Sequence, residues 1–387
     1  MSEVSTSHCQ RHQFVVFGPD WGRHPSTSQH LFSELLDSNS VVWVETVGLR
    51  LPQLNLRDLR RSWQKLLDYF TGRRQGIASE QSGLTVVCPL TLPFTQYRCV
   101  RRFNLWQIRR AVAGACQRLG FTQHTLVVTA PSHCDVVGRL GESLSIFYCP
   151  DNYALWPGMN PRLVHCMELE LTDRVGAIVA VSDCLGERLK ASGKPLLVLT
   201  QGVNAAHFAR SLPPQSSGRF EIVYFGMIDE RLDLDLLVEL AQRLPQALIR
   251  MIGPVLINPT RLREQPNVRL EPQVPFATLP ASLSTASLFI LPFSLNELSK
   301  SCSPLKMKEY LACGRPVVAT AVPEAERLAP FVHVASDQAS FVTAVAAAVE
   351  GRLPFDAEAV KLMIAREGWD AKAQEFIQFV ESQRPRH

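Results

Sequence analysis

Residues Ser301–Gly314, SCSPLKMKEYLACG, are followed by the apolar run Pro316-Val317-Val318-Ala319-Thr320. Ser303 is placed to cap a helix and Pro304 suits its first position, while Gly314 would end the helix about three turns later. The unpaired N–H groups at the start of such a helix attract an anion. The stretch therefore predicts a short helix with an anion-binding end, followed by a buried strand.

Two charged side chains on this helix indicate the ligand. Lys306 falls in the first turn, where its ammonium would add a point charge beside a phosphate. Glu309 follows three residues later on the same face, and its carboxylate can accept two hydrogen bonds from a sugar diol. The pair indicates a nucleoside diphosphate. From spacing alone, a capped helix with a solvated Lys306–Glu309 ion pair remains the alternative.

The same residues resemble a known family. The similarity is to the donor-site signature of GT-B glycosyltransferases, among them the group 1 (GT4-like) bacterial enzymes of polysaccharide biosynthesis. It covers most of the chain and rests on these segments: Ser303-Pro304-Leu305-Lys306, Glu309-Tyr310-Leu311-Ala312, Gly314-Arg315-Pro316-Val317-Val318, Pro323-Glu324, Gly226-Met227-Ile228-Asp229-Glu230-Arg231, Gln201-Gly202-Val203-Asn204 with Phe208, and, more loosely, Trp21, His24-Pro25-Ser26 and Ser28-Gln29-His30.

The resemblance implies a set of donor-binding residues: Gly226, Arg231, Ser301, Ser303, Lys306, Met307 and Glu309. Many relatives carry a pair of glutamates in this region; Glu309 matches the second, and Ser301 stands where the first would be. Many also carry an arginine and a lysine after the glycine of the first C-terminal strand. Here Arg231 follows Gly226 but no lysine does, so we expect Lys306 to take the second phosphate charge.

Composition fits a chain of two globular domains. The 387 residues are 46% apolar and 20% charged, which predicts two real cores and argues against extensive disorder. A net charge of +4 without a basic, aromatic-rich run gives no reason to expect a nucleic-acid partner. The ten cysteines form no CxxC pair, and no signal-peptide or membrane-spanning pattern is found. We therefore expect a cytoplasmic location.

Short apolar runs alternate with helical patterns, which predicts parallel, doubly wound sheets. The fold class is therefore α/β, and the resemblance specifies GT-B: two Rossmann-like domains with ligands in the cleft between them. A polar, proline-containing segment at 211–218 predicts the linker. The expected domains are an acceptor-binding domain (1–212), a nucleotide-sugar-binding domain (219–368) and a C-terminal helix (369–387) that packs back on the first domain. The predicted strands are Phe14–Phe17, Val41–Val44, Thr125–Thr129, Leu144–Tyr148, Ala177–Val181, Leu196–Leu199, Ile222–Phe225, Ala247–Ile252, Leu288–Leu291 and Val317–Thr320.

The donor side offers cations and one candidate metal motif. Gly226 would let the backbone approach a phosphate, and Arg231 can fork onto diphosphate oxygens, unless both belong to an ordinary surface turn. Asp233-Leu234-Asp235 resembles a metal-binding Asp-x-Asp, but it begins an amphipathic helix whose dipole accounts for the acids. We therefore expect no metal and no cofactor. Phe276 is expected either beside the nucleobase or as a simple helix-start residue.

Polar residues after two strands of the first domain are the acceptor-side candidates. Trp21, His24, Ser26 and Gln29 would bind acceptor hydroxyls, although Ser26 also suits a helix cap. Asp151, after the strand Leu144–Tyr148, is the candidate base for the acceptor hydroxyl. The alternatives are a turn aspartate or, in a retaining enzyme, a residue that only positions substrate. The predicted catalytic residues are thus Asp151, Lys306 and Arg231.

Two basic stretches, 49–74 and 97–112, mix arginine with Trp, Phe and Leu. Basic amphipathic helices of this kind can lie on an anionic membrane surface, or can simply cover a sheet with arginine on the wet face. Peripheral association with the inner membrane would suit a lipid-linked acceptor.

The predicted function is transfer of a hexose from a nucleoside diphosphate sugar to a polysaccharide or glycan acceptor, here expected to be lipid-linked. The expected partners are therefore the nucleotide sugar, the glycan or lipid-linked acceptor and an anionic membrane surface. A nucleotide-sugar epimerase of the same fold and a catalytically silent nucleotide-binding scaffold are the alternatives.

Overall fold

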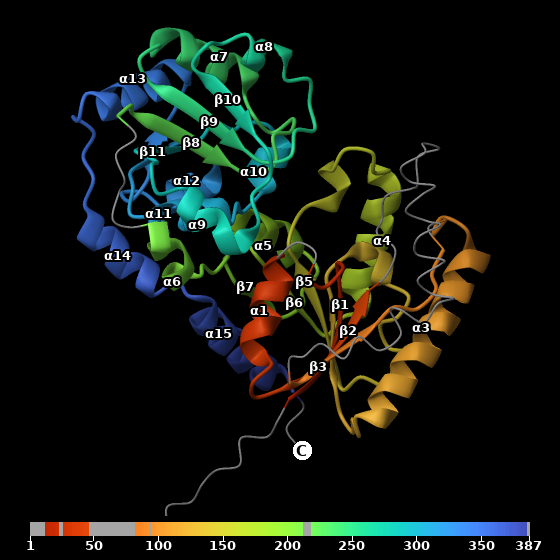
Figure 1. The fold of residues 1–387 in the computed structure, drawn as a ribbon. Coiled ribbons are helices and arrows are strands. Elements are labelled where there is room, and N and C mark those ends of the chain that lie inside the picture. Colours follow the sequence, from red (N-terminus) through yellow and green to blue (C-terminus); the bar gives the residue numbers. More distant parts are fainter. Residues whose placement is uncertain (1–11, 23–25, 46–81, 93, 212–217, 385–387) are drawn as a thin grey trace, which may run out of the picture. The chain divides into compact units, whose positions relative to one another are not determined.

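The computed structural model describes residues 12–22, 26–45, 82–92, 94–211 and 218–384. The chain divides into two compact units, Met1–Leu199 with Ala373–His387, and Thr200–Lys372. Figure 1 shows that each unit is built on a sheet of side-by-side strands with helices packed around it. Every strand pairing in both sheets is parallel, so the predicted α/β, doubly wound class is confirmed.

Among its described residues, the first unit holds a seven-stranded sheet in the order β3-β2-β1-β4-β5-β6-β7. Strands such as β1 are buried on both faces of the sheet, which is why their sequences are continuous apolar runs. The elements are β1 (Gln13–Gly18), α1 (Thr27–Leu35), β2 (Ser40–Glu45), β3 (Leu84–Val87), α3 (Arg98–Arg118), β4 (Thr125–Val128), η1 (Pro131–His133), β5 (Leu144–Cys149), η2 (Tyr153–Leu155), α4 (Pro161–Arg174), β6 (Ala177–Ala180), α5 (Asp183–Lys190) and β7 (Leu196–Val198).

The second unit holds a six-stranded sheet, within the described part of the chain, in the order β10-β9-β8-β11-β12-β13. Its elements are α6 (Ala205–Phe208), η3 (Ala209–Ser211), β8 (Glu221–Phe225), α7 (Leu234–Arg243), β9 (Leu248–Ile252), α8 (Thr260–Arg263), β10 (Val268–Glu271), η4 (Phe276–Thr278), α9 (Leu279–Ser282), β11 (Leu288–Leu291), α10 (Glu297–Ser301), α11 (Lys306–Ala312), β12 (Val317–Thr320), α12 (Pro323–Arg327), β13 (His333–Ala335), α13 (Gln338–Val349) and α14 (Ala357–Ala365); α15 (Trp369–Gln383) follows.

Three strands were not predicted: β3, β10 and β13. All three lie at the edges of their sheets, and most of their residues are partly or fully exposed. Since an edge strand is buried less than a central one, its sequence does not need a continuous apolar run. The ten predicted strands all exist, with bounds that differ by one or two residues at most.

The second unit begins at Thr200, earlier than the predicted linker at 211–218, of which residues 212–217 lie outside the described residues. The reason is packing, because Val203 and Phe208 are buried in the core of the second unit. At the other end, Ala373–His387 groups with the first unit. There the Phe376 ring lies 6.1 Å from the Phe14 ring and 5.7 Å from the Phe32 ring.

Candidate donor-binding site

The predicted donor residues gather where β8 ends and α11 begins. Gly226 directly follows β8 and has a φ of 141°, a conformation that favours glycine. A Cβ added there would lie 2.3 Å from Nζ of Lys306, the first residue of α11. Gly226 therefore leaves the space that the Lys306 ammonium occupies.

Lys306 is held by aromatic neighbours. Its ammonium donates a hydrogen bond of 2.9 Å to the hydroxyl of Tyr224, which in turn donates one of 2.7 Å to the backbone carbonyl of Met227. Nζ also lies 4.7 Å from the centre of the Tyr224 ring and 5.4 Å from that of Phe293. Tyr224 is fully buried in β8. These contacts are electrically neutral, so they orient the ammonium without neutralising it.

Burial shifts the ionisation of Lys306 and Glu309, the two charged residues of α11 that were predicted to bind the donor. It lowers the pKa of Lys306 to about 7, helped by the nearby positive charge of Arg231 and opposed by Asp229 and Glu309. It also raises the pKa of Glu309 to about 7, against a smaller lowering by Lys306. Since an anion would stabilise the charged form of Lys306, the site favours a negatively charged ligand near neutral pH.

Arg231 is oriented by Asp229, a carboxylate whose role the sequence analysis missed. Its Nε and Nη2 donate to the two Asp229 oxygens over 3.0 Å and 2.6 Å, and the guanidinium carbon lies 5.6 Å from the centre of the Phe293 ring. Because Asp229 holds one side of the planar guanidinium group, the remaining N–H donors of Arg231 point in a defined direction. The only indication of this contact in the sequence was that Asp229 and Arg231 are two residues apart.

The start of α11 differs from the prediction. The helix begins at Lys306 with Leu305 at its N-cap, and no side chain caps it, so Ser303 is not the cap. The reason is that α10 ends at Ser301, so the residues between Ser301 and Lys306 form the turn between the two helices. Ser303 is 8% exposed, and its hydroxyl has no hydrogen-bond partner among the described residues. It is thus a buried polar group that a ligand can satisfy.

Two predicted donor residues have structural roles. The side chain of Met307 is fully buried in the core of the second unit. Ser301 donates its hydroxyl proton to the backbone carbonyl of Leu298, 2.9 Å away, at the end of α10. The side chain of Met307 thus packs in the core, and its place among the donor-binding residues stays a prediction.

The candidate nucleobase residue Phe276 is also engaged elsewhere. Its ring stacks on His207 at 4.1 Å between centres and 11° between planes, and its carbonyl lies 2.9 Å from Nε2 of His207. This face of Phe276 is consequently covered by another side chain of the second unit.

The Asp233-Leu234-Asp235 segment begins a helix, as expected. Asp233 is the N-cap of α7, where it accepts from the backbone of Leu236 at 2.9 Å and from Gln338 at 3.0 Å. Asp235 forms an ion pair of 2.7 Å with Arg261. Both carboxylates have local partners, which explains this acidic pair without a bound ion.

Comparison with known proteins bears on the region that carries this geometry. Residues 219–351 match the family model described as glycosyl transferases group 1. This segment belongs to the group 1 glycosyltransferase family. The resemblance inferred from Lys306, Glu309 and the neighbouring motifs is thereby confirmed, and the sites described above lie in the group 1 segment or next to it.

A relative and two solved structures are similar to this chain. The putative teichuronic acid biosynthesis glycosyltransferase TuaH of Bacillus subtilis is 26% identical over 187 residues, which are 44% of this chain and 47% of TuaH. The chain thus matches less than half of the length of TuaH. HepE of Anabaena, solved with UDP-glucose, has a TM-score of 0.66 at 12% identity, covering 96% of this chain and 99% of that one. Sucrose-phosphate synthase of Thermosynechococcus elongatus has a TM-score of 0.68 at 15% identity, with the same coverage. These structural likenesses establish the GT-B fold.

The predicted acceptor residues of this GT-B protein shape a loop of the first unit. Ser26 caps α1 and accepts from the backbone of Gln29 at 3.3 Å, so the helix-cap alternative is confirmed. Gln29 in turn donates to the carbonyl of Asp20 at 2.9 Å. The backbone N–H of Trp21 donates to Glu45 at 2.7 Å, and its ring packs edge-on against Trp43. His24 lies outside the described residues.

Asp151 lies two residues beyond the carboxyl end of β5, the position that its sequence predicts. One carboxylate oxygen accepts a hydrogen bond of 2.7 Å from the backbone of Asn152, and Asn152 itself caps the short helix η2. The aspartate is half-buried. Its role as a base stays a prediction.

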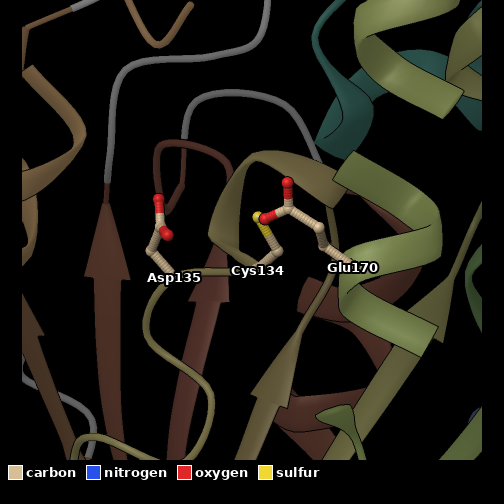
Figure 2. A group of neighbouring side chains, drawn as sticks. All are labelled: Cys134, Asp135 and Glu170. Atoms are coloured by element: carbon tan, nitrogen blue, oxygen red, sulfur yellow. The ribbon is translucent and has the colours of Figure 1, made fainter. Parts of the chain in front are cut away.

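One group in the first unit has the composition of a metal site. Cys134, Asp135 and Glu170 place their potential ligand atoms within 4.8 Å of one another, and Figure 2 shows the sulfur of Cys134 beside the Glu170 carboxylate. Arg101 bridges both carboxylates, with contacts of 2.6 Å to each. Burial raises the pKa of the Cys134 thiol to about 12. A paired set of carboxylates with a protonated thiol is an ion-pair network that joins α3, η1 and α4.

Proposed function

We propose that the protein is a metal-independent glycosyltransferase that moves a hexose from a nucleoside diphosphate sugar to a lipid-linked polysaccharide or glycan acceptor. The observation that carries the proposal is the Lys306 ammonium, held over Gly226 by the neutral Tyr224 hydroxyl and close enough to Arg231 for their charges to interact. Two half-buried cations this close together are suited to a diphosphate.

Each donor residue has a chemical role in this proposal. Lys306 and Arg231 neutralise the charge that develops on the leaving diphosphate, a contribution of about 3 kcal/mol for each lost electrostatic donor. Glu309 accepts hydrogen bonds from the ribose diol, and the buried Ser303 hydroxyl supplies a further polar contact. Asp151 takes the proton of the acceptor hydroxyl as that oxygen attacks the sugar.

The same charges support the proposal of metal independence. A divalent ion in such enzymes offsets the charge of the leaving diphosphate, a task that Lys306 and Arg231 perform here. The local partners of Asp233 and Asp235 support this proposal, since each carboxylate already has a hydrogen bond or an ion pair.

The proposal of a lipid-linked acceptor at an anionic membrane surface rests on α3. This helix contains six arginines and no acidic residue, and Trp106 on it and Tyr97 just before it are more than half exposed. Basic and aromatic side chains together favour the interface of an anionic bilayer. Within the described ranges, no helix is both long and apolar enough to cross a bilayer. The other predicted membrane stretch, 49–74, lies outside the described residues.

The test is a titration of purified protein with UDP-, GDP- and dTDP-sugars without added metal, in which the thermal midpoint of unfolding is measured. A ligand that binds only the folded state stabilises that state, by about 2.7 kcal/mol at one hundred times its Kd, and so raises the thermal midpoint. We expect one base to give a shift that vanishes in Lys306→Ala and persists in Lys361→Ala, an exposed lysine of α14. Absence of a shift with every donor, or a full shift in Lys306→Ala, contradicts the proposal.

A further inference from the structure

Lys308 is a cation in the core of the second unit. Its side chain is 1% exposed, and its ammonium donates to Glu367 at 2.6 Å, to the hydroxyl of Thr200 at 3.4 Å and to the backbone carbonyl of Gln201. On α11, Lys308 points about 200° away from Lys306, because successive helical residues are rotated by roughly 100°. The helix thus carries the donor residues on one face and a buried ammonium on the other.

The partners of Lys308 lie where the chain passes between the two units. Thr200 is the first residue of the second unit, and Glu367 is five residues before its last, Lys372. These two segments are also joined to each other: the N–H of Val203 donates to the carbonyl of Glu367 at 2.9 Å. Val203 and Gly368 form a parallel bridge. Lys308 therefore binds both connections at the point where they run side by side.

The fit around this junction is close. Gly202 lies against the Trp369 ring so tightly that an added Cβ would come within 2.5 Å of it. A shift of either connection must consequently move the other. Through its three hydrogen bonds, Lys308 extends this rigid junction to α11.

The charges explain why the junction tolerates a buried lysine. Burial lowers the pKa of Lys308, and the hydrogen bond with Glu367 opposes that effect. Burial alone would raise the pKa of Glu367, but its contacts with Lys308 and Lys372 lower it instead. Lys372 lies 3.2 Å from Glu367, so this carboxylate keeps a partner when Lys308 is replaced. A buried ion pair is weak as a source of stability but strongly directional, which suits a role in positioning.

We propose that Lys308 is a positioning residue that couples nucleotide-sugar binding on the opposite face of α11 to the two connections, residues 200–204 and 366–372. This inference rests on the proposed donor site at Lys306 and Glu309. Donor binding fixes α11, and Lys308 passes that restraint to the backbone through Gln201, Thr200 and Glu367.

The test is hydrogen exchange of the full chain with and without UDP-glucose, or the donor that gives the largest thermal shift. The reporter is the peptide that contains the Val203 amide, which bonds to Glu367. In the wild type we expect exchange there to slow about fivefold or more on binding, the lower end of typical coupling between sites. In Lys308→Met we expect less than about twofold slowing under saturating ligand. The matched control, Lys361→Met on the exposed surface of α14, should behave as the wild type.

Further variants and the wild-type result separate the possible interpretations. Lys308→Arg, which keeps the charge, should recover part of the slowing, whereas a purely space-filling role would favour Met. If Lys308→Met does not fold, Glu367→Gln removes the ionic partner while keeping its shape, and it should also weaken the coupling. Equal slowing in wild type and variants, or binding without slowing in the wild type, overturns the coupling alone. Failure of the wild type to bind any nucleotide sugar overturns the proposed function as well.

Discussion

The Tyr224 hydroxyl accepts a 2.9 Å hydrogen bond from the Lys306 ammonium while giving its own proton to the carbonyl of Met227. Because the phenol proton is committed to the backbone, the hydroxyl can act only as an acceptor toward Lys306. The last residues of β8 therefore direct the ammonium over Gly226. This relationship links strand, turn and helix at the proposed donor site.

Removing the hydroxyl should weaken donor binding without disrupting the fold. Tyr224→Phe keeps the ring beside Lys306 but deletes the hydrogen bond, whose net worth to a charged group is about 1.5–3 kcal/mol. We expect donor affinity to fall by roughly tenfold, or about 1.4 kcal/mol. Calorimetric titration would measure it; an affinity equal to that of the wild type would show that Tyr224 does not orient Lys306.

Donor affinity should fall as the pH rises. The pKa of Lys306 in the free site is about 7, and a bound diphosphate would raise it by Coulomb attraction. The charged, binding-competent form is therefore depleted between pH 6 and 8, which should lower the affinity for UDP-glucose by about tenfold. UDP-glucose suits this titration because its diphosphate is esterified at both ends.

The control for the pH effect is Lys306→Arg, because a guanidinium stays charged throughout this range. Its affinity should be lower but nearly independent of pH. Any remaining slope would report Glu309, whose pKa is also about 7. A wild-type affinity that is flat from pH 6 to 8 would contradict a titrating lysine in the site.

The two-point ion pair between Asp229 and Arg231 predicts different results for two conservative changes. Arg231→Lys cannot make the two-point contact with Asp229, so the cation loses its direction, and we expect a loss of donor affinity of about tenfold. Asp229→Asn keeps an acceptor for one guanidinium N–H and should lose less. Both variants should be compared by donor titration and thermal midpoint. The reverse order of affinities would mean that the carboxylate charge, rather than its geometry, controls the site.

The two glycines at the ends of β8 and β9 should respond differently to alanine. Gly253 has a φ of 147°, and an added Cβ would lie 2.0 Å from the backbone oxygen of Gly226. At Gly226 the added atom would meet the movable end of Lys306. Each change strains the backbone by about 1–3 kcal/mol.

Because a backbone oxygen cannot give way as a side chain can, Gly253→Ala should destabilise the protein more than Gly226→Ala. Gly226→Ala should instead lose donor binding through displacement of Lys306. Denaturant unfolding and donor titration of both variants measure the two effects separately. Equal destabilisation with intact binding would contradict this account.

Most of the fold could be predicted because central parallel strands need continuous apolar runs, as in Phe14–Phe17 and Leu288–Leu291. Edge strands have no such requirement, which is why Val268–Glu271, with an exposed arginine, was missed. Likewise, a linker assigned from Pro and Ser content at 211–218 gave no indication that Val203 and Phe208 pack into the second core.

The sequence motifs named the charged residues of the proposed donor site, and the structure brings Lys306, Arg231 and Glu309 close together. Tyr224, Asp229 and Lys308 were missed because their roles depend on partners distant in sequence or on the local turn. The motif gave no indication that the side chain of Met307, at a helix position between two site residues, packs into the core. Ser303 was predicted as a cap, which would start the helix at residue 304. Because α10 ends at Ser301, α11 begins two residues later, at Lys306.

The return of Ala373–His387 to the first unit has a consequence for biosynthesis. The sequence of the second unit is continuous, so all its strands have left the ribosome before the first unit can be completed. Until then Phe14 and Phe32 lack the Phe376 ring, and His12 lacks its 3.2 Å contact with Glu381. Part of the apolar surface of the first unit therefore stays uncovered until the segment that carries Phe376 has been synthesised.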